Sequence, residues 1–376
     1  MNQIHKGPNL RGTMAKFCLR YCARGNVLIS SLLWASLALC ITPSAAFPVK
    51  TPETGICYPY NALKYSTSQA NEILDTQTSL SAGVLGANNT TVTLAVCTTA
   101  VNPGPMLQAW LEYHLRRFDL IMVFIDDPSE RPLFESLVHN NLHHDPRIML
   151  LKGHPDRSDM SPSGVMNRQN SNTQVAVDIA LENNITWLLH IDSDELFYED
   201  GDRTWLSLPG VDHITFLNHE AVPVAHNDVK NPFLACTLFK VNGGRLDFMA
   251  YGNGKSAVRI QPGVQSWGVH TFTGYSGEHR TLTRPMILHY PNPSFDSWVA
   301  KYRSYGRFSN FWFEDPTQVN PLTFMLESRD RLHRALESGL WEEAREFFVG
   351  MIPDQEACER MLRTGDMRRY NPLQGI

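Results

Sequence analysis

The pattern Asp192-Ser193-Asp194 directly follows an apolar run, Trp187 to Ile191, and it is the segment best suited to chemistry. In an extended segment, residues i and i+2 point the same way, so both carboxylates can converge on one hard cation, directly or through water. A divalent ion held there would bridge two phosphates of a nucleotide and neutralise the charge that builds on a departing diphosphate. The alternative is that the two aspartates only cap the next turn.

A second acid pair, Asp126 and Asp127, follows another apolar run, Leu120 to Ile125. The hydrophobic pattern around both pairs predicts four strands that alternate with helices. Two of the four strands are apolar throughout, which is typical of a parallel sheet with both faces covered by helices. In such sheets ligands gather at the carboxyl ends of the strands, so we expect both acid pairs around one crevice. The expected strands are 92–98, 120–125, 147–151 and 187–191, and the expected helices are 104–118, 132–139 and 167–183.

Composition places the chain among folded globular proteins. It has 376 residues, of which 43% are apolar and 19% charged, and its formal net charge is -5. This charge gives no basic surplus for a phosphate backbone, so we expect no nucleic-acid partner. Every charged residue before Glu53 is basic, and without residues 1–46 the chain has 28 bases against 38 acids, a net charge of -10.

The N-terminal region has the pattern of a targeting segment. A basic stretch precedes the uncharged apolar run Val27 to Ile41, and small residues follow at Ser44 and Ala46. This pattern predicts either a secretory signal cleaved after Ala46 or an uncleaved signal anchor, and both send the rest of the chain into the secretory lumen. Glycosylation sequons begin at Asn88, Asn89 and Asn184.

The chain divides into four expected parts. Residues 1–46 are the signal peptide or signal anchor, and the polar, proline-containing residues 47–90 are a stem or linker. Residues 91–305 are the main folded domain, whose second half is expected to contain short strands separated by glycines. Residues 306–376 are a C-terminal helical extension.

Several segments, taken in order, resemble glycosyltransferases of the GT-A fold, specifically the family 2-like and family 92-like group. The resemblance covers about residues 92 to 305, and its strength lies in the ordered set. Asn102-Pro103 departs from the family, which usually has Asn-Glu there, and Ala109 departs where an acid commonly precedes the tryptophan. The matching segments are Trp110-Leu-Glu-Tyr-His114, Phe124-Ile-Asp-Asp-Pro-Ser129, Arg168-Gln169, the block from Trp187 to Phe197, Gly254-Lys255-Ser-Ala-Val-Arg259, Gly268-Val-His270, and Leu288-His289-Tyr290 before Trp298 and Lys301-Tyr302.

The resemblance implies a metal centre and a nucleotide-sugar site. Asp192 and Asp194 would hold Mn²⁺ or Mg²⁺ on the diphosphate, and mixed oxygen and nitrogen ligation would favour manganese. The third ligand would be a late histidine, and we choose His270 in preference to His289. For either residue the alternative is a histidine of the core or the surface that binds no metal.

Four residues would bind the rest of the donor. Asp126 and Asp127 would accept hydrogen bonds from the nucleoside, with an Asx turn opened by Pro128 as the alternative for one of them. Arg168 and Lys255 would supply cationic donors to phosphate, a solvated arginine being the alternative.

A catalytic base is also implied, because an inverting transferase needs a carboxylate to take the proton of the acceptor hydroxyl. Glu220, Asp247 and Glu278 are available, and we favour Glu278, which stands beside His279 in the glycine-rich stretch.

The implied fold is α/β of the GT-A type, a Rossmann-like, mostly parallel sheet flanked by helices, with a smaller mixed acceptor-side region and C-terminal helices. The implied activity is metal-dependent, inverting transfer of a sugar, a hexose, from a nucleotide-diphosphate sugar to a hydroxyl of a glycan or glycoprotein. The expected location is the Golgi lumen as a type II membrane protein, or secretion after signal cleavage. The alternative function is a catalytically inactive GT-A-fold binding or scaffold protein of the secretory pathway.

Overall fold

The computed structural model describes residues 92–201, 203–225, 229–241, 248–310 and 323–374. The expected targeting segment, residues 1–46, and the expected stem, residues 47–90, lie outside these ranges. Within the described ranges, no helix combines the length and the apolar character needed to cross a membrane. The choice between a cleaved signal and an anchor therefore stays a prediction.

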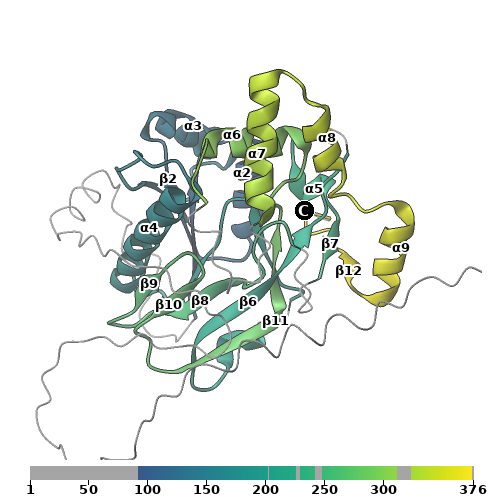
Figure 1. The fold of residues 1–376 in the computed structure, drawn as a ribbon. Helices are drawn as coiled ribbons and strands as arrows, with labels where there is room; N and C mark the ends of the chain where they lie inside the picture. The colour runs from purple at the N-terminus through teal and green to yellow at the C-terminus, as the bar shows by residue number, and fades with distance from the viewer. Residues whose placement is uncertain (1–91, 202, 226–228, 242–247, 311–322, 375–376) are drawn as a thin grey trace, which may run out of the picture. The chain divides into compact units, whose positions relative to one another are not determined.

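One mixed sheet of ten strands and a separate two-stranded ribbon make up the β-structure of the described residues (Figure 1). The sheet contains β1 (Leu94–Ala100), β2 (Leu120–Ile125), β3 (Ile148–Lys152), β4 (Trp187–His190), β5 (Glu195–Tyr198), β6 (Val211–Ala221), β7 (Leu238–Lys240), β8 (Lys255–Arg259), β11 (Glu278–His289) and β12 (Met367–Arg369). The ribbon pairs β9 (Gln265–Trp267) with β10 (Thr271–Thr273).

The helices are α2 (Pro105–His114), α3 (Arg131–Asn141), α4 (Pro162–Glu182), α5 (Pro232–Ala235), α6 (Phe295–Tyr305), α7 (Thr323–Ser338), α8 (Glu342–Val349) and α9 (Gln355–Thr364). Two short 3₁₀ helices, η1 (Pro128–Glu130) and η2 (Thr204–Ser207), complete the elements. Proline stands in the first turn of α2 and of α4, where its missing N–H has no intrahelical partner to lose.

The first half of the chain forms the parallel part of the sheet, in the order β4-β1-β2-β3. β2 is buried along its whole length, as is β1 except at Thr99, because helices cover both faces. Alternate residues of β1 enter two different cores, since successive strand side chains point to opposite faces. Val96 packs in the core that contains Trp110 of α2, and Cys97 packs in the core that contains Ala176 of α4. The predicted α/β fold with a Rossmann-like sheet is confirmed.

The second half of the chain builds the mixed region predicted beside the parallel strands. β8 runs antiparallel to β4, and β6 runs antiparallel to β8. The long strand β11 pairs parallel to β6 and antiparallel to β5. In these pairings His289 stands opposite Glu195 and opposite Glu220, which brings the end of β11 to the acidic segment after β4.

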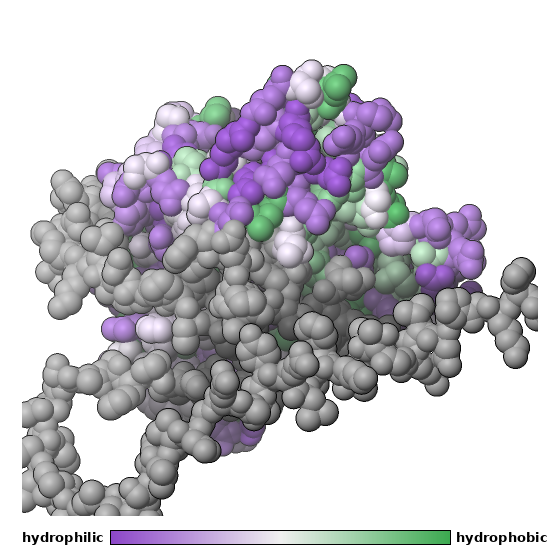
Figure 2. All heavy atoms as spheres, viewed as in Figure 1, coloured by the Kyte–Doolittle hydropathy of each residue, from purple (hydrophilic) through white to green (hydrophobic). Residues whose placement is uncertain are grey.

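The C-terminal helices form a third core with α6, built from residues such as Trp298, Leu332 and Phe348. Figure 2 shows that the side of α7 turned toward the viewer is largely hydrophilic. Residues 306–376 also contribute β12, which pairs antiparallel with β7 at the edge of the main sheet. The C-terminal extension is therefore part of the sheet as well as a set of helices.

Candidate active site

The turn after β4 holds three acidic residues in a fixed arrangement. The backbone N–H of Glu195 donates to the carbonyl of Asp192 over 3.1 Å, and the Glu195 carboxylate accepts from the Asp192 N–H over 2.7 Å. The carbonyl of Asp194 accepts from the N–H of Tyr290 over 2.9 Å. These bonds fix the turn at the carboxyl end of β4, where ligands gather in sheets of this type.

Lys255 pairs with the first aspartate. Its Nζ is fully buried, lies 2.8 Å from Oδ2 of Asp192, and is 3.7 Å from Oε2 of Glu195. Oδ1 of Asp192 accepts from Nε2 of Gln169 over 2.8 Å. Burial alone would raise the pKa of Asp192, but the charge and hydrogen bond of Lys255 together with the neighbouring His190 and His270 hold this pKa below its ordinary value. Both oxygens of Asp192 are therefore occupied by protein groups.

Asp194 is held more loosely and keeps access to solvent. Its Oδ2 lies 3.6 Å from Nζ of Lys301 and 3.8 Å from Nε2 of His289, and a quarter of its side chain is exposed. Burial of its carboxyl raises the pKa of Asp194, against the opposing charge of Lys301. Nζ of Lys301 also donates to the carbonyl of Pro291 over 3.1 Å. The two aspartates differ in their partners and not in their exposure, since the Asp192 side chain is 22% exposed.

Two histidines complete the cluster, and both are predicted ligands. Nδ1 of His270 lies 2.9 Å from the carbonyl of Gly254, which can only accept, so this nitrogen carries the proton and Nε2 has a lone pair. Burial lowers the pKa of His270 to about 3 and that of His289 well below its ordinary value, so both rings are neutral at pH 7. The ring of Tyr251 contacts both, 4.5 Å from His270 and 4.8 Å from His289 between centroids.

These donors are suited to a divalent cation by type, because carboxylate oxygen and neutral imidazole nitrogen are ligands that Mn²⁺ accepts. Across the described ranges, however, no three His, Cys, Asp or Glu side chains are gathered as one metal-ligand group. The carboxylate of Asp194 and the neutral imidazoles are the donors that Lys255 and Gln169 do not occupy. The metal thus stays a prediction.

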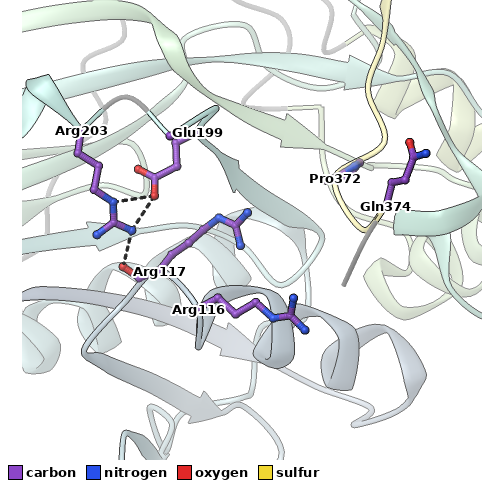
Figure 3. A pocket seen from close by; sticks show the side chains of 7 residues that line it. Arg116, Arg117, Glu199, Arg203, Pro372 and Gln374 are labelled. Carbon is purple, nitrogen blue, oxygen red and sulfur yellow. Dashed lines mark hydrogen bonds and ion pairs between the residues drawn. The ribbon is translucent and has the colours of Figure 1, made fainter.

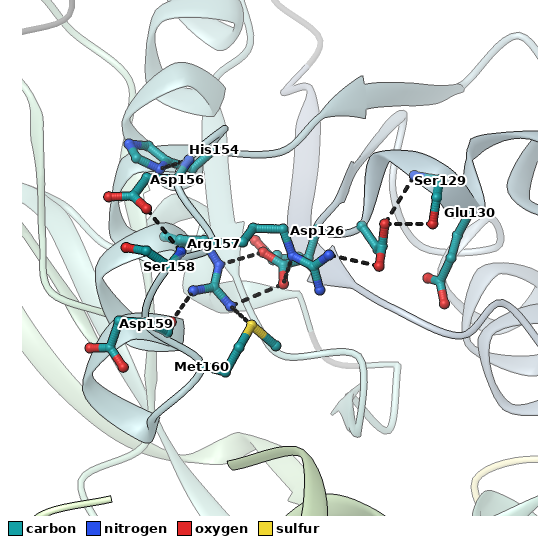
Figure 4. Close-up of polar contacts among 12 residues, drawn as sticks. Asp126, Ser129, Glu130, His154, Asp156, Arg157, Ser158, Asp159 and Met160 are labelled. Carbon is teal, nitrogen blue, oxygen red and sulfur yellow. Dashed lines mark hydrogen bonds and ion pairs between the residues drawn. The ribbon is translucent and has the colours of Figure 1, made fainter. Parts of the chain in front are cut away.

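The second acid pair forms a network with two arginines (Figure 4). Asp126 accepts from Nε of Arg168 over 2.7 Å and from its Nη2 over 3.1 Å, and both side chains are buried. Asp127 accepts from Ser129 over 3.0 Å to the backbone N–H and 2.7 Å to Oγ, and its other oxygen lies 2.6 Å from Nη1 of Arg157. Bonds from Ser129 and Arg157 lower the pKa of Asp127 to about 2.

For Asp127 the structure shows the alternative interpretation, the Asx turn, because its carboxylate caps η1. For Arg168 it excludes a solvated side chain, since the guanidinium is buried against Asp126 and the carbonyl of Asp159. Direct contact of these residues with a nucleotide stays a prediction. β2, which leads into Asp126 and Asp127, runs parallel to β4 with β1 between them. Both acid pairs therefore lie at one edge of the sheet.

The structure does not bring Glu278 to this cluster. Glu278 opens β11, whose other end is His289, and the intervening strand spans on the order of 30 Å. Its side chain is mostly exposed and pairs with Arg280. Our choice of Glu278 as the base is therefore corrected, because a general base must reach the reacting hydroxyl.

The other two candidate bases do not replace it. Glu220 is fully buried, and its carboxylate accepts the backbone N–H groups of Met249 and Ala250 over 2.7 and 2.9 Å. Asp247 lies outside the described residues. The structure assigns no base from these three candidates.

No role was predicted for Gln169, Lys301 or Arg157, although Gln169 and Lys301 stand in segments that resemble the family, and all three contact the predicted acids. Lys301 lies on α6 between the core residues Trp298 and Tyr302. Their spacing predicts the helix but does not predict that Lys301 contacts Asp194. Arg157 lies in the loop before α4 and has no signal in the sequence.

Comparison with known proteins gives two curated relatives, both from Arabidopsis thaliana and both named as glycosyltransferase-like. Glycosyltransferase-like At2g41451 is 30% identical over 161 residues, which cover 36% of this chain and 36% of the relative. Glycosyltransferase-like At3g57200 is 26% identical over 237 residues, or 55% of this chain and 45% of the relative. The predicted resemblance to glycosyltransferases is confirmed. This chain matches less than half of the length of either relative, so the names alone assign it no activity.

No family model matches the chain. Among solved structures, HddC from Yersinia pseudotuberculosis in complex with GMP-PN aligns with a TM-score of 0.31 and 11% identity, over 56% of this chain and 97% of that one. A cytidylyltransferase from Leptospira borgpetersenii aligns with a TM-score of 0.23 and 14% identity, over 33% of this chain and 53% of that one. Scores this low support no statement about the ligands of this chain.

Proposed function

We propose that this chain is a glycosyltransferase that moves a sugar from a nucleotide-diphosphate sugar to a hydroxyl of a glycan or glycoconjugate. The observation that carries the proposal is the charge arrangement after β4, where Asp192 and Asp194 face Lys255 and Lys301 at the carboxyl edge of the sheet. The names of the two curated relatives support the same activity.

The two lysines would act on the donor in different ways. Lys301 has a partly exposed side chain, so its ammonium group can contact a diphosphate directly. Lys255 is fully buried against Asp192 and would act through its charge, which favours negative charge developing on the departing nucleoside diphosphate. Preorganised charges of this kind act without reorganisation at the moment of reaction.

We also propose that the donor binds together with Mn²⁺ or Mg²⁺. Asp194 and one neutral imidazole, His270 or His289, would hold the ion, with Asp192 acting through water because its oxygens already accept bonds. When bound, the ion would supply positive charge to the diphosphate. Chelator treatment followed by titration of Mn²⁺, read as a change in melting temperature, tests metal binding separately from turnover.

Hexose transfer and inversion of configuration come from the resemblance alone, since the described candidates for the base lie away from the cluster or are bonded to backbone. Analysis of the product anomer by NMR would distinguish inversion from retention. The identity of the transferred sugar follows from the same experiment once a donor is found.

The decisive experiment uses the purified chain with a panel of nucleotide-diphosphate sugars and measures release of the nucleoside diphosphate. We expect Asp194→Asn to lower this release by about a hundredfold or more, on the scale of losing one preorganised electrostatic contact. Glu182→Gln is the matched control, because Glu182 is an exposed carboxylate at the end of α4.

The measured binding and turnover distinguish a transferase from an inactive binding protein. Wild-type binding of a nucleoside diphosphate without turnover would favour the inactive binding or scaffold protein. Absence of both binding and turnover, with Asp194→Asn indistinguishable from wild type, would refute the transferase proposal.

For location, we propose the secretory lumen, either as a type II membrane protein of the Golgi or as a secreted protein. The support is the N-terminal sequence pattern, and Asn184 offers a test because it is exposed in the loop after α4. Endoglycosidase sensitivity that is reduced in Asn184→Gln would place this face of the chain in the lumen. Carbonate extraction of cell membranes would then separate an anchored form from a secreted form.

A further inference from the structure

A cavity of about 380 Å³ lies on the far side of the fold from the candidate active site. α2 starts near the carboxyl end of β1 and returns toward the start of β2, so Arg116 and Arg117, which follow α2, stand at the opposite edge of the sheet. β5 starts at Glu195 in the acidic cluster and runs toward the same edge of the sheet. Glu199, which directly follows β5, lines the cavity. The cavity is therefore a site of its own.

Three arginines and a single carboxylate give this cavity a positive charge. Arg203 is neutralised locally, because its Nε and Nη2 donate to Oε1 of Glu199 over 3.0 and 2.7 Å. Among the described residues no such partner neutralises Arg116 or Arg117, although the whole chain carries a net charge of -5. Within the part of the chain that the structure describes, Arg116 is exposed and makes no hydrogen bond or ion pair.

Arg117 is held in place but is not satisfied. Its Nη1 donates to the carbonyl of Tyr113 over 2.8 Å, and its guanidinium lies 3.6 Å from the centre of the Tyr113 ring. Its own carbonyl accepts from Nη2 of Arg203 over 3.2 Å. The Nε of Arg117 is buried and has no hydrogen-bond partner, and the same is true of Oε2 of Glu199. Both atoms are closed to solvent, so a ligand in the cavity would meet the outer part of the Arg117 guanidinium and not its Nε.

Figure 3 shows the shape of the site: Arg116, Arg117 and Arg203 stand apart from Pro372 and Gln374, which come from the C-terminal segment. The amide of Gln374 can both donate and accept, which suits hydroxyl groups. The volume is larger than a bare oxyanion needs and falls within the range of small-molecule sites, about 300–1,000 Å³.

We propose that this cavity binds a small molecule that carries a phosphate or sulfate group on a hydroxylated, sugar-sized body. Planar guanidinium groups recognise such oxyanions by paired N–H donors, and of the three arginines that line the cavity, Arg116 and Arg117 have no carboxylate partner among the described residues. The position away from Asp192 and Asp194 means that this ligand is distinct from the proposed donor.

The test is calorimetric titration of the full chain with glucose 6-phosphate, glucose 6-sulfate, inorganic phosphate and glucose. We expect one or both of the charged sugars to bind more tightly than inorganic phosphate, and no binding of glucose. Arg116→Ala should weaken binding about tenfold or more, the scale of one hydrogen bond to a charged group. Arg363→Ala is the matched control, because Arg363 is an exposed arginine on α9, and it should leave binding unchanged.

Arg117→Ala extends the test, provided its melting temperature shows that the fold survives loss of the contact with Tyr113. A competition arm separates this site from the proposed active site: a saturating nucleoside diphosphate should not displace glucose 6-phosphate, and Asp194→Asn should bind it as wild type does. Equal binding by Arg116→Ala and Arg363→Ala, displacement by the nucleotide, or no binding of any charged probe would overturn the proposal. None of these results depends on whether the chain transfers sugar.

Discussion

The ammonium group of Lys255 lies 2.8 Å from Oδ2 of Asp192 at a position fully closed to solvent. The first carboxylate of the acid pair is thus neutralised by a protein cation at hydrogen-bond distance, whereas Asp194 lies 3.6 Å from Lys301; the two aspartate side chains are similarly exposed, 22% and 25%. The two aspartates therefore have different roles. Asp192 has both oxygens bonded by Lys255 and Gln169, and Asp194, whose contacts are longer, is the carboxylate that can meet a ligand.

Replacing the buried lysine tests this division. Lys255→Met should lower the free energy of unfolding by about 3–5 kcal/mol, because it leaves Asp192 and Glu195 without their buried counter-charge. Urea denaturation measures the loss, and Lys152→Met, at an exposed lysine on β3, is the control. The double variant Lys255→Met/Asp192→Asn should be more stable than Lys255→Met alone; if it were less stable, the pair would not be the cause.

The residue before Lys255 must be glycine. Gly254 has a φ of +76°, and a Cβ there would overlap the carbonyl of Phe216. Gly339 has a similar φ of +73° but open space around it. Replacing it with alanine therefore measures the cost of the backbone conformation without a steric overlap. Gly339→Ala should cost about 1–2 kcal/mol of unfolding free energy, and Gly254→Ala about 1–3 kcal/mol more, since it adds a steric overlap. Equal losses in thermal or chemical denaturation would count against a close approach at Gly254.

The two arginines that pair with Asp126 and Asp127 differ in burial, so their replacement should lower the free energy of unfolding by different amounts. Arg168→Ala should lower the free energy of unfolding by about 3–5 kcal/mol, because Asp126 would stay buried without its bidentate partner. Arg157→Ala should cost about 1 kcal/mol or less, because Arg157 is partly exposed where it meets Asp127. Arg168→Lys should restore only part of the loss, since lysine lacks the planar fork. Similar effects of Arg168→Ala and Arg157→Ala would contradict the buried pair.

His114 makes stability depend on pH. Its Nδ1 lies 2.8 Å from the carbonyl of Trp110, its Nε2 accepts from the N–H of Phe197 over 3.3 Å, and burial lowers its pKa to about 3. Between the ordinary value of 6.5 and about 3, the unfolded chain binds a proton that the folded chain does not. Stability therefore falls as pH falls through this window, by about 2 kcal/mol between pH 7 and pH 5 from His114 alone.

Denaturation curves across that pH range check this sign. His114→Gln should be less stable than wild type at pH 7, and the difference should shrink toward pH 5. His143→Gln, at an exposed histidine, should follow the wild-type curve. A constant difference between His114→Gln and wild type would show that His114 does not contribute to the pH dependence.

The parallel half of the fold was predictable from sequence because its signals are local. The apolar runs Leu120 to Ile125 and Trp187 to Ile191 are long enough to fix strands buried on both faces, and the acids after them mark the carboxyl ends. The element bounds differ from expectation by a few residues, most at α4, which starts at Pro162 because Ser161 caps it. The Asp192 and Asp194 pair was found for the same reason.

The partners of those acids were not predictable, because they come from distant segments. Lys301 and His289 meet Asp194 only because β11 pairs antiparallel with β5 and α6 follows it. Glu278 was chosen for its neighbours in sequence, but a twelve-residue strand carries it to the other end of the sheet.

Local sequence signals were enough to predict the order of strands and helices from β1 to β4, the acid pair at the end of β4 and the basic, apolar pattern at the N-terminus, since each depends on neighbouring residues. Only the tertiary structure decided which charge faces which. It paired the buried Lys255 with Asp192, placed Lys301 beside Asp194, paired Asp126 with Arg168 and gathered Arg116, Arg117 and Arg203 around one cavity. Electrostatic interactions depend on distance and burial, and those are properties of the folded chain.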